Sequence, residues 1–249
     1  MMNRFLWIVA VLVGAQSGSA TAQTRVDQLL TDYSRIMTMS CEIRKDSATP
    51  DGEGRMLSRV WFEAPNRLLV ENFTPFKRKI LCDGQNLYYY ADDGNTAIQQ
   101  PFNEIRDDMR LQTQSVPASP MEHLFRLKGL PETNLTATTQ WPVRTGYTAS
   151  NLYAVLCFDS TNRLAIVEFY TSAEMTNCYA KTVYSVFEQP VSGVWLPLRH
   201  ETEITVQGQM KARETRRFSN LKVNQSVPAD TFKHEKVFPG VTFAAPPRN

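Results

Sequence analysis

The chain has 249 residues, of which 42% are hydrophobic and 21% charged, with a formal net charge of +2 at pH 7. This near-neutral balance argues against a nucleic-acid-binding protein and against membrane binding by charge alone. After the first residues, no apolar segment approaches the ~20 residues that a transmembrane helix needs.

Residues 1–22 predict a secretory signal peptide. Arg4 gives the start a positive charge, and Phe5–Val13 is an apolar core too short to span a bilayer. Ala20-Thr21-Ala22 then matches the small-residue pattern after which signal peptidase cuts. A buried strand or a membrane anchor is the less favoured alternative. We therefore expect a mature chain from about Gln23 that works outside the cytoplasm.

The mature chain is predicted to open with an amphipathic helix. Thr24 is a suitable N-cap, and Asp27 follows it three residues later, as in a capping box. Apolar residues then recur at helical spacing and form one stripe. The stripe consists of Val26, Leu29, Leu30, Tyr33, Ile36 and Met37.

Alternating apolar and polar residues predict short antiparallel strands after this helix. Pro50-Asp51-Gly52, Pro65-Asn66 and Asp83-Gly84 mark tight turns between them. Because successive strand residues point to opposite faces, one face of this meander is apolar and the other charged. The apolar face carries Val60, Phe62, Leu68, Val70, Ile80 and Cys82, and the charged face carries Arg59, Glu63, Glu71 and Asp83.

Helical signals interrupt the alternation in the middle of the chain. The charged segment 103–112 is compatible with a short helix. A second predicted helix starts at Ser119-Pro120-Met121-Glu122, with Ser as N-cap, Pro at the first position and Glu closing a capping box, and it ends at Gly129. Its apolar face includes Met121, Leu124 and Phe125.

Strand-like alternation returns in the second half of the chain. Asp159–Asn162 and Gly208-Gln209 are hairpin signals. The predicted strands lie at 152–158, 163–170, 179–187, 194–198, 200–207 and 210–218. No linker, repeat or low-complexity block separates the two halves, so we expect residues 23–249 to form one domain.

No catalytic, cofactor or metal motif is found. His123, His200 and His234 are far apart in the sequence and lack metal-helix spacing, and GxSxG, P-loop and GxGxxG patterns are absent. Asp92-Asp93 and Asp107-Asp108 are carboxylate pairs in solvated segments, which leaves hydrolysis as a weak alternative. We therefore expect no catalytic residue, no metal and no cofactor.

The cysteine pattern leaves two interpretations open. Cys41, Cys82, Cys157 and Cys178 all lie in the mature chain and are compatible with two disulfides, in three possible pairings, or with buried free thiols. No pair has the CxxC spacing of a redox motif or a zinc knuckle.

Together these elements predict a strongly curved sheet packed on helices. An apolar concave face of that kind either holds an apolar ligand or is ordinary core, and both interpretations fit the pattern.

The order of the motifs resembles the periplasmic lipoprotein carrier (LolA-like) family. Val60–Arg67 reads VWFEAPNR, a Trp-containing strand end followed by a Pro-Asn turn. Ile80–Tyr90 reads ILCDGQNLYYY, similar to the strand-turn-strand pattern ILxxDGxxLWxY of that family. Phe232 and Pro239-Gly240-Val241 resemble its closing F…P-x-G-V segment. The match covers most of the mature chain and is loose between about residues 103 and 141.

The resemblance implies a mainly β fold with helices, an incomplete antiparallel β-barrel under a helical lid. It implies a soluble, monomeric periplasmic carrier, not an enzyme, that holds acyl chains of lipoproteins or other lipids. Such a carrier meets an inner-membrane release complex and an outer-membrane acceptor, and no nucleic acid. The implied cavity residues are Val60, Phe62, Leu68, Val70, Ile80 and Cys82, and the lid candidates are Met121, Leu124 and Phe125.

One departure from the family pattern concerns loading. The best-known carriers have an Arg immediately before the Pro, and that Arg is linked to lid closure and energy-dependent loading. This chain has Ala64 before Pro65, and Arg67 is not at the matching position. The same fold also serves as a sensor module in envelope-stress regulators. A LolA-fold module that binds an envelope protein without transporting lipoproteins is therefore the alternative prediction.

Overall fold

The computed structural model describes residues 23–91, 94–150 and 152–246. The predicted signal peptide, 1–22, lies outside the described residues, and so do Asp92 and Asp93. Among the described helices, none is long and apolar enough to cross a membrane.

The described residues form two sets of β-strands. The first set is β1 (Thr38–Thr49), β2 (Gly52–Glu63), β3 (Arg67–Thr74), β4 (Arg78–Asp83), β5 (Asn86–Tyr90) and β6 (Ala97–Pro101). The second set is β7 (Glu132–Asn134), β8 (Val143–Ala149), β9 (Leu152–Phe158), β10 (Leu164–Tyr170), β11 (Cys178–Val191), β12 (Val194–Val206) and β13 (Gln209–Val223).

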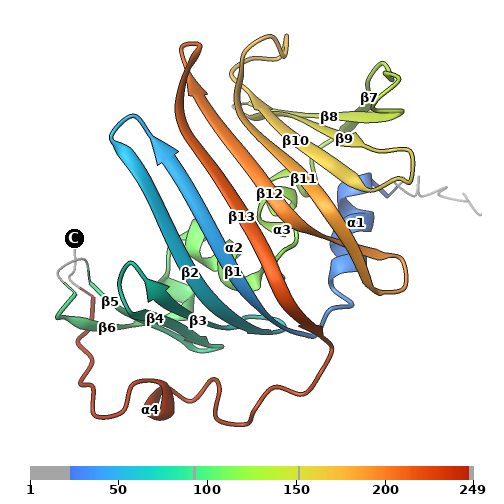
Figure 1. The fold of residues 1–249 in the computed structure, drawn as a ribbon. Coiled ribbons are helices and arrows are strands. Elements are labelled where there is room, and N and C mark those ends of the chain that lie inside the picture. Colours follow the sequence, from blue (N-terminus) through green and yellow to red (C-terminus); the bar gives the residue numbers. More distant parts are fainter. Residues whose placement is uncertain (1–22, 92–93, 151, 247–249) are drawn as a thin grey trace, which may run out of the picture.

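All of these strands belong to one curved antiparallel sheet, which does not close into a barrel (Figure 1). The order across the sheet is β6-β5-β4-β3-β2-β1-β13-β12-β11-β10-β9-β8-β7. Each half is thus a meander of sequence neighbours, and the β1–β13 pairing joins the two halves. The predicted architecture, mainly β and incompletely closed, is confirmed.

The predicted strands are mostly found, with two differences. The segments 194–198 and 200–207 are one strand, β12, because Arg199 continues the pairing with both Ser185 and Arg217. The edge strands β6 and β7, and β8 beside β7, were not predicted. Their polar residues and Gly146 give no clear alternation of apolar and polar positions.

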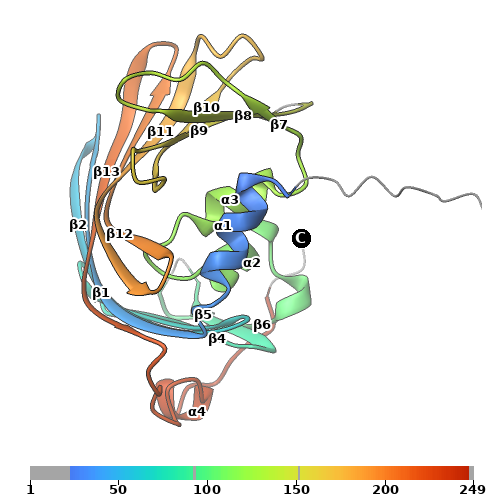
Figure 2. The ribbon, with the colours of Figure 1, turned by 90° about the vertical axis from the view of Figure 1, so that its right-hand side faces the viewer.

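The helices of the described part are α1 (Arg25–Tyr33), α2 (Asp107–Gln114), α3 (Met121–Leu127) and α4 (His234–Val237), with a 3₁₀ turn at Phe102–Glu104. Figure 2 shows α1, α2 and α3 inside the curve of the sheet, whereas α4 lies outside it. The concave face of the sheet therefore packs on helices.

The predicted start of α1 is confirmed in detail. The backbone N–H of Asp27 donates to Thr24 Oγ1 at 3.1 Å, and the Thr24 N–H donates back to the Asp27 carboxylate, which closes the capping box. The helix ends earlier than the apolar stripe. Ile36 is still buried although it follows the helix, whereas Met37 is exposed.

The predicted capping box of α3 is wrong. Pro120 takes the N-cap position, and no side chain caps it. The Ser119 hydroxyl donates instead to the Val116 carbonyl at 2.6 Å and accepts from the Met121 N–H at 3.3 Å. Ser119 therefore stabilises the turn before the helix. Gly129, with φ of +76°, follows the helix end as predicted.

The segment after β13 forms a C-terminal clasp, residues 225–246, on the convex face of the sheet (Figure 1). Val237 and Phe238 of the clasp are buried against Leu69, Leu81 and Tyr88. At its end the clasp pairs with the edge strand β6: the Ala244 N–H donates to the Ala97 carbonyl at 2.9 Å, and the Gln99 N–H donates to the Ala244 carbonyl at 3.0 Å. The clasp thus covers both a convex apolar patch and an otherwise open sheet edge.

We predict that Phe238→Ala destabilises the protein by about 3–5 kcal/mol, the usual cost of truncating a buried aromatic ring. The Phe238 ring lies 5.4 Å from that of Phe243 and 6.2 Å from that of Tyr90, so the truncation leaves a cavity. Urea unfolding measures the effect, with exposed Phe76→Ala as the control. Equal midpoints for the two variants would show that the clasp does not stabilise the sheet.

Candidate functional site

Strand register brings the six predicted cavity residues together on the concave face. Phe62 of β2 pairs with Leu68 of β3, which pairs with Cys82 of β4. The neighbouring row on the same face consists of Val60, Val70 and Ile80. The alternation of apolar and polar residues in the sequence therefore identified residues that form one continuous apolar surface.

This apolar surface is packed against the helices. Phe62 and Cys82 are 2% and 0% exposed, and they belong to the same core cluster as Val26 of α1 and Leu124 of α3. Val70 and Ile80 are half-buried at the margin of that core. In this arrangement the helices occupy the concave face, and Val70 and Ile80 are its most accessible predicted positions.

The three lid candidates lie in one short helix. Met121 and Leu124 are buried in the core, and Phe125 is half-buried and packs against it. The structure thus places the apolar face of α3 where the sequence predicts it, over the concave face of the sheet.

A second group of side chains, here called the polar strip, lies where α3 meets β11, β12 and β13. Tyr184, His200 and Arg216 are paired in one row across these three strands. Glu122 and His123 of α3 lie close enough to influence their charges. α3 therefore contacts apolar residues on one side and polar residues on the other.

His200 links the sheet directly to the segment before α3. Its Nε2–H donates to the Ala118 carbonyl at 3.2 Å, and its ring packs edge-on against Tyr184 at 4.8 Å. Burial, reinforced by the nearby Arg216, lowers the pKa of His200 to about 3. His200 is therefore neutral near pH 7 and serves as a hydrogen-bond donor.

Two polar atoms of the strip lack partners within the described part of the chain. The Tyr184 hydroxyl is buried without a hydrogen bond, and so is Nδ1 of His123. Burial raises the pKa of Tyr184 and lowers that of His123, so both groups stay uncharged at neutral pH. An unsatisfied buried donor costs about 1–3 kcal/mol, so the contact between α3 and the sheet carries an energetic penalty.

The polar strip was missed in the sequence because its members are far apart along the chain. His123 and His200 were noted only as isolated histidines. Their proximity depends on how α3 packs on the sheet at β12, which no local pattern reveals. Within the residues that the structure describes, no group of three or more His, Cys, Asp or Glu side chains is placed to hold a metal ion.

The four cysteines are free thiols, which decides between the two alternatives left open by their pattern. Cys41 and Cys82 lie on β1 and β4, with β2 and β3 between them. Burial raises the pKa of Cys41 to about 12 and that of Cys82 to about 11, so both thiols are unreactive near neutral pH. Both contribute to the concave core.

The turn that lacks the family arginine is held by other contacts. The Ala64 N–H donates to the Met37 carbonyl at 2.8 Å. Arg67 pairs with Glu63 at 3.0 Å and donates to the Asp83 carbonyl at 3.2 Å, so it stabilises the turns and does not face the lid. Arg216 is a cation close to α3: burial opposes its charged form, but Glu214 and then Glu122 of α3 raise the pKa of Arg216.

Two hollows lie away from these apolar rows. One, of about 170 Å³, lies between α1 and the hairpins β9–β10 and β11–β12, with Arg25, Tyr33 and Trp195 in its wall. A cavity of about 150 Å³ holds a molecule of the size of benzene, so this hollow is too small for an acyl chain. A second, of about 450 Å³, lies between the turn at Asp83 and the clasp residue His234.

Comparison with known proteins points in one direction. No family model matches the chain. The outer-membrane lipoprotein carrier protein of Coxiella burnetii (strain RSA 331 / Henzerling II) is 29% identical over 106 residues, which are 41% of this chain and 46% of that protein. The carrier proteins of two further strains match equally. The chain thus spans about half the length of the curated relatives it matches.

Solved structures extend the likeness to most of the chain. A LolA superfamily protein from Nitrosomonas europaea has a TM-score of 0.54 at 14% identity, covering 85% of this chain and 98% of that one. A putative outer membrane lipoprotein-sorting protein domain from Vibrio parahaemolyticus has a TM-score of 0.55 at 9% identity, covering 85% and 97%. At such identities the likeness shows the fold. The chain therefore shares the fold of these proteins and, over 106 residues, is distantly similar in sequence to an outer-membrane lipoprotein carrier protein.

Proposed function

We propose that this protein is a non-enzymatic periplasmic carrier that binds acyl chains of lipoproteins or other lipids on its concave face. The observation that carries the proposal is the pair of neighbouring apolar rows, one of which contains half-buried Val70 and Ile80, covered by helices instead of by another sheet. The distant similarity to lipoprotein carriers supports it. In this proposal residues 23–249 act as one unit after removal of residues 1–22.

The energetics suit a carrier that must release its load. Each acyl CH₂ group removed from water contributes about 0.8 kcal/mol, so a chain of some fifteen such groups gains about 12 kcal/mol. Because α1, α2 and α3 occupy the concave face, an entering chain replaces apolar contacts that the helices already make. This exchange offsets much of the gain and keeps binding reversible.

We propose that α3, with the segment before it, is the element that moves. Its contact with the polar strip leaves Tyr184 and His123 unsatisfied, and opening would return both groups to water. If the contact between α3 and the sheet were purely apolar, opening would not return any polar group to water. The proposed carrier would receive its load from an inner-membrane release complex and deliver it to an outer-membrane acceptor.

We predict that Val70→Asp and Ile80→Asp each weaken binding of a fluorescent fatty acid at least about tenfold, because an acyl chain does not compensate a desolvated carboxylate. Both residues are half-buried, so we expect the variants to stay folded. Val186→Asp, at an exposed apolar position of β11, is the matched control.

A titration with the fluorescent probe, together with thermal unfolding, measures this. Failure of the unaltered protein to bind acyl probes would refute the carrier proposal and favour the alternative, a LolA-fold module that binds an envelope protein. Unfolding of both Asp variants would show that the rows are ordinary core.

We predict a pH-dependent stability that originates in His200. Its pKa is about 3 in the folded protein and about 6.5 in the unfolded chain, so the unfolded state binds the proton first as the pH falls. Stability is unaffected above pH 6.5 and decreases by up to about 1.4 kcal/mol per pH unit between 6.5 and 3.

His200→Gln keeps a neutral donor for the Ala118 carbonyl and removes the titration, so its unfolding temperature should fall less steeply between pH 6.5 and 4. His234→Gln, at an exposed position of the clasp, controls for loss of a histidine. Parallel pH profiles for all three proteins would contradict the assignment of this effect to His200.

A further inference from the structure

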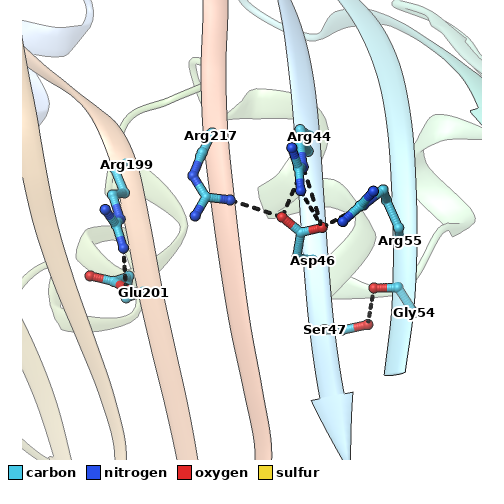
Figure 3. Close-up of polar contacts among 8 residues, drawn as sticks. All are labelled: Arg44, Asp46, Ser47, Gly54, Arg55, Arg199, Glu201 and Arg217. Atoms are coloured by element: carbon cyan, nitrogen blue, oxygen red, sulfur yellow. Dashed lines mark hydrogen bonds and ion pairs between the residues drawn. The ribbon is translucent and has the colours of Figure 1, made fainter. Parts of the chain in front are cut away.

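The convex face carries a row of arginines that runs across neighbouring strands. Arg199 of β12 pairs with Arg217 of β13, and Arg217 pairs with Arg44 of β1. Arg55 of β2 lies in the next row, beside Asp46. Figure 3 shows these side chains on the near side of the sheet, with helices behind the strands. We call Arg44, Arg55, Arg199 and Arg217 the arginine row.

The charges of the arginine row are only partly neutralised. Asp46 binds three of the arginines, with distances of 2.9 Å to Arg44 and 2.8 Å to both Arg55 and Arg217. Glu201 binds the fourth, Arg199, at 2.7 Å. Four cations against two carboxylates leave a net charge of +2, which equals the formal net charge of the whole chain.

The flanking rows lack this excess. On one side Arg59 pairs with Glu42 at 3.0 Å, and on the other Arg213 pairs with Glu203 at 3.6 Å. Like charges directly opposite each other on adjacent strands destabilise a sheet. The arginine row is therefore a local concentration of positive charge that the sheet tolerates at a cost, and hydrogen bonds from Arg55 and Arg44 lower the pKa of Asp46 to about 2.

The row is open to solvent and retains unused donors. The exposed fractions of its side chains lie between 39% for Arg199 and 63% for Arg55. Within the described residues, Arg55 and Arg217 each donate one hydrogen bond, to Asp46, although a guanidinium has five N–H groups. These free donors suit ligands with several anionic oxygens, such as phosphate groups.

Exposed apolar side chains continue the same face. Leu57 of β2 pairs with Arg44, and Leu57 pairs in turn with Thr74 at the end of β3. Leu57, Phe73 and Phe76 are all exposed, and Phe76 is 69% exposed in the turn after β3. Cations beside exposed Leu and Phe are the combination by which proteins lie on a membrane surface.

We propose that the arginine row binds the phosphates of an anionic lipid surface, with Leu57, Phe73 and Phe76 entering the headgroup region. The small net charge of the chain argues against binding by charge alone, and this surface combines local charge with apolar anchors. The clasp covers the convex face at β3–β5 and leaves the arginine row free. This docking does not depend on what the concave face binds.

Co-sedimentation of the mature protein with vesicles tests the proposal. Vesicles of phosphatidylcholine containing phosphatidylglycerol should bind the protein at low ionic strength, and pure phosphatidylcholine vesicles should not. Each arginine removed should weaken binding about fivefold, so Arg44→Gln combined with Arg217→Gln should weaken it about twenty-five-fold. Asp46→Asn should strengthen binding about fivefold, because it removes a negative charge from the row.

The control combines Arg106→Gln with Lys233→Gln, which removes the same charge from exposed sites just before α2 and in the clasp. Phe76→Ser should weaken binding without any change of charge. The proposal is overturned if the unaltered protein ignores anionic vesicles, or if the control loses as much affinity as the Arg44/Arg217 variant. Binding to polyglutamate but not to vesicles would also overturn it and assign the row to an acidic protein.

Discussion

The pairing of β1 with β13 is the interaction on which the rest of the molecule depends. It joins residues 39–48 to residues 213–223 and so combines two local meanders into one sheet. Closing so long a loop costs only slightly more entropy than closing a short one, because the cost grows with the logarithm of loop length. On the concave face the pairing sets the apolar rows beside the polar strip, and on the convex face it completes the arginine row.

In the lid motion that we propose, the two sides of α3 act in opposite directions. Leu124 is fully buried in the concave core and stabilises closure. On the other side, the Tyr184 hydroxyl and Nδ1 of His123 have no hydrogen-bond partner among the described residues and oppose it. A helix held by opposing contributions of a few kcal/mol is easily shifted by a ligand that replaces the apolar contacts. His200, bonded to the Ala118 carbonyl, links the segment before α3 to the sheet.

Local patterns predicted much of the fold and of the concave face. The alternation through Val60, Phe62 and Val70 identified the apolar side of β2 and β3, because period-two burial is a local property of a strand. The capping box at Thr24 could be predicted for the same reason, because it involves residues only three positions apart. The polar strip could not be predicted, because it depends on where α3 packs on the sheet, nor could the arginine row, because it depends on register between strands remote in sequence. Arg44 and Arg217, for example, are neighbours only through the β1–β13 pairing.

The late position of β13 and the clasp in the sequence also determines when the protein can fold. β1 is among the first strands to be synthesised, yet one of its two neighbours is the last strand of the sheet. Ala244, which covers the far edge of β6, comes later still. Assembly must therefore wait for nearly the whole chain, and folds dominated by such distant contacts form slowly. A chain that is threaded across a membrane before folding would gain from this delay, because its early segments cannot complete the sheet during transit.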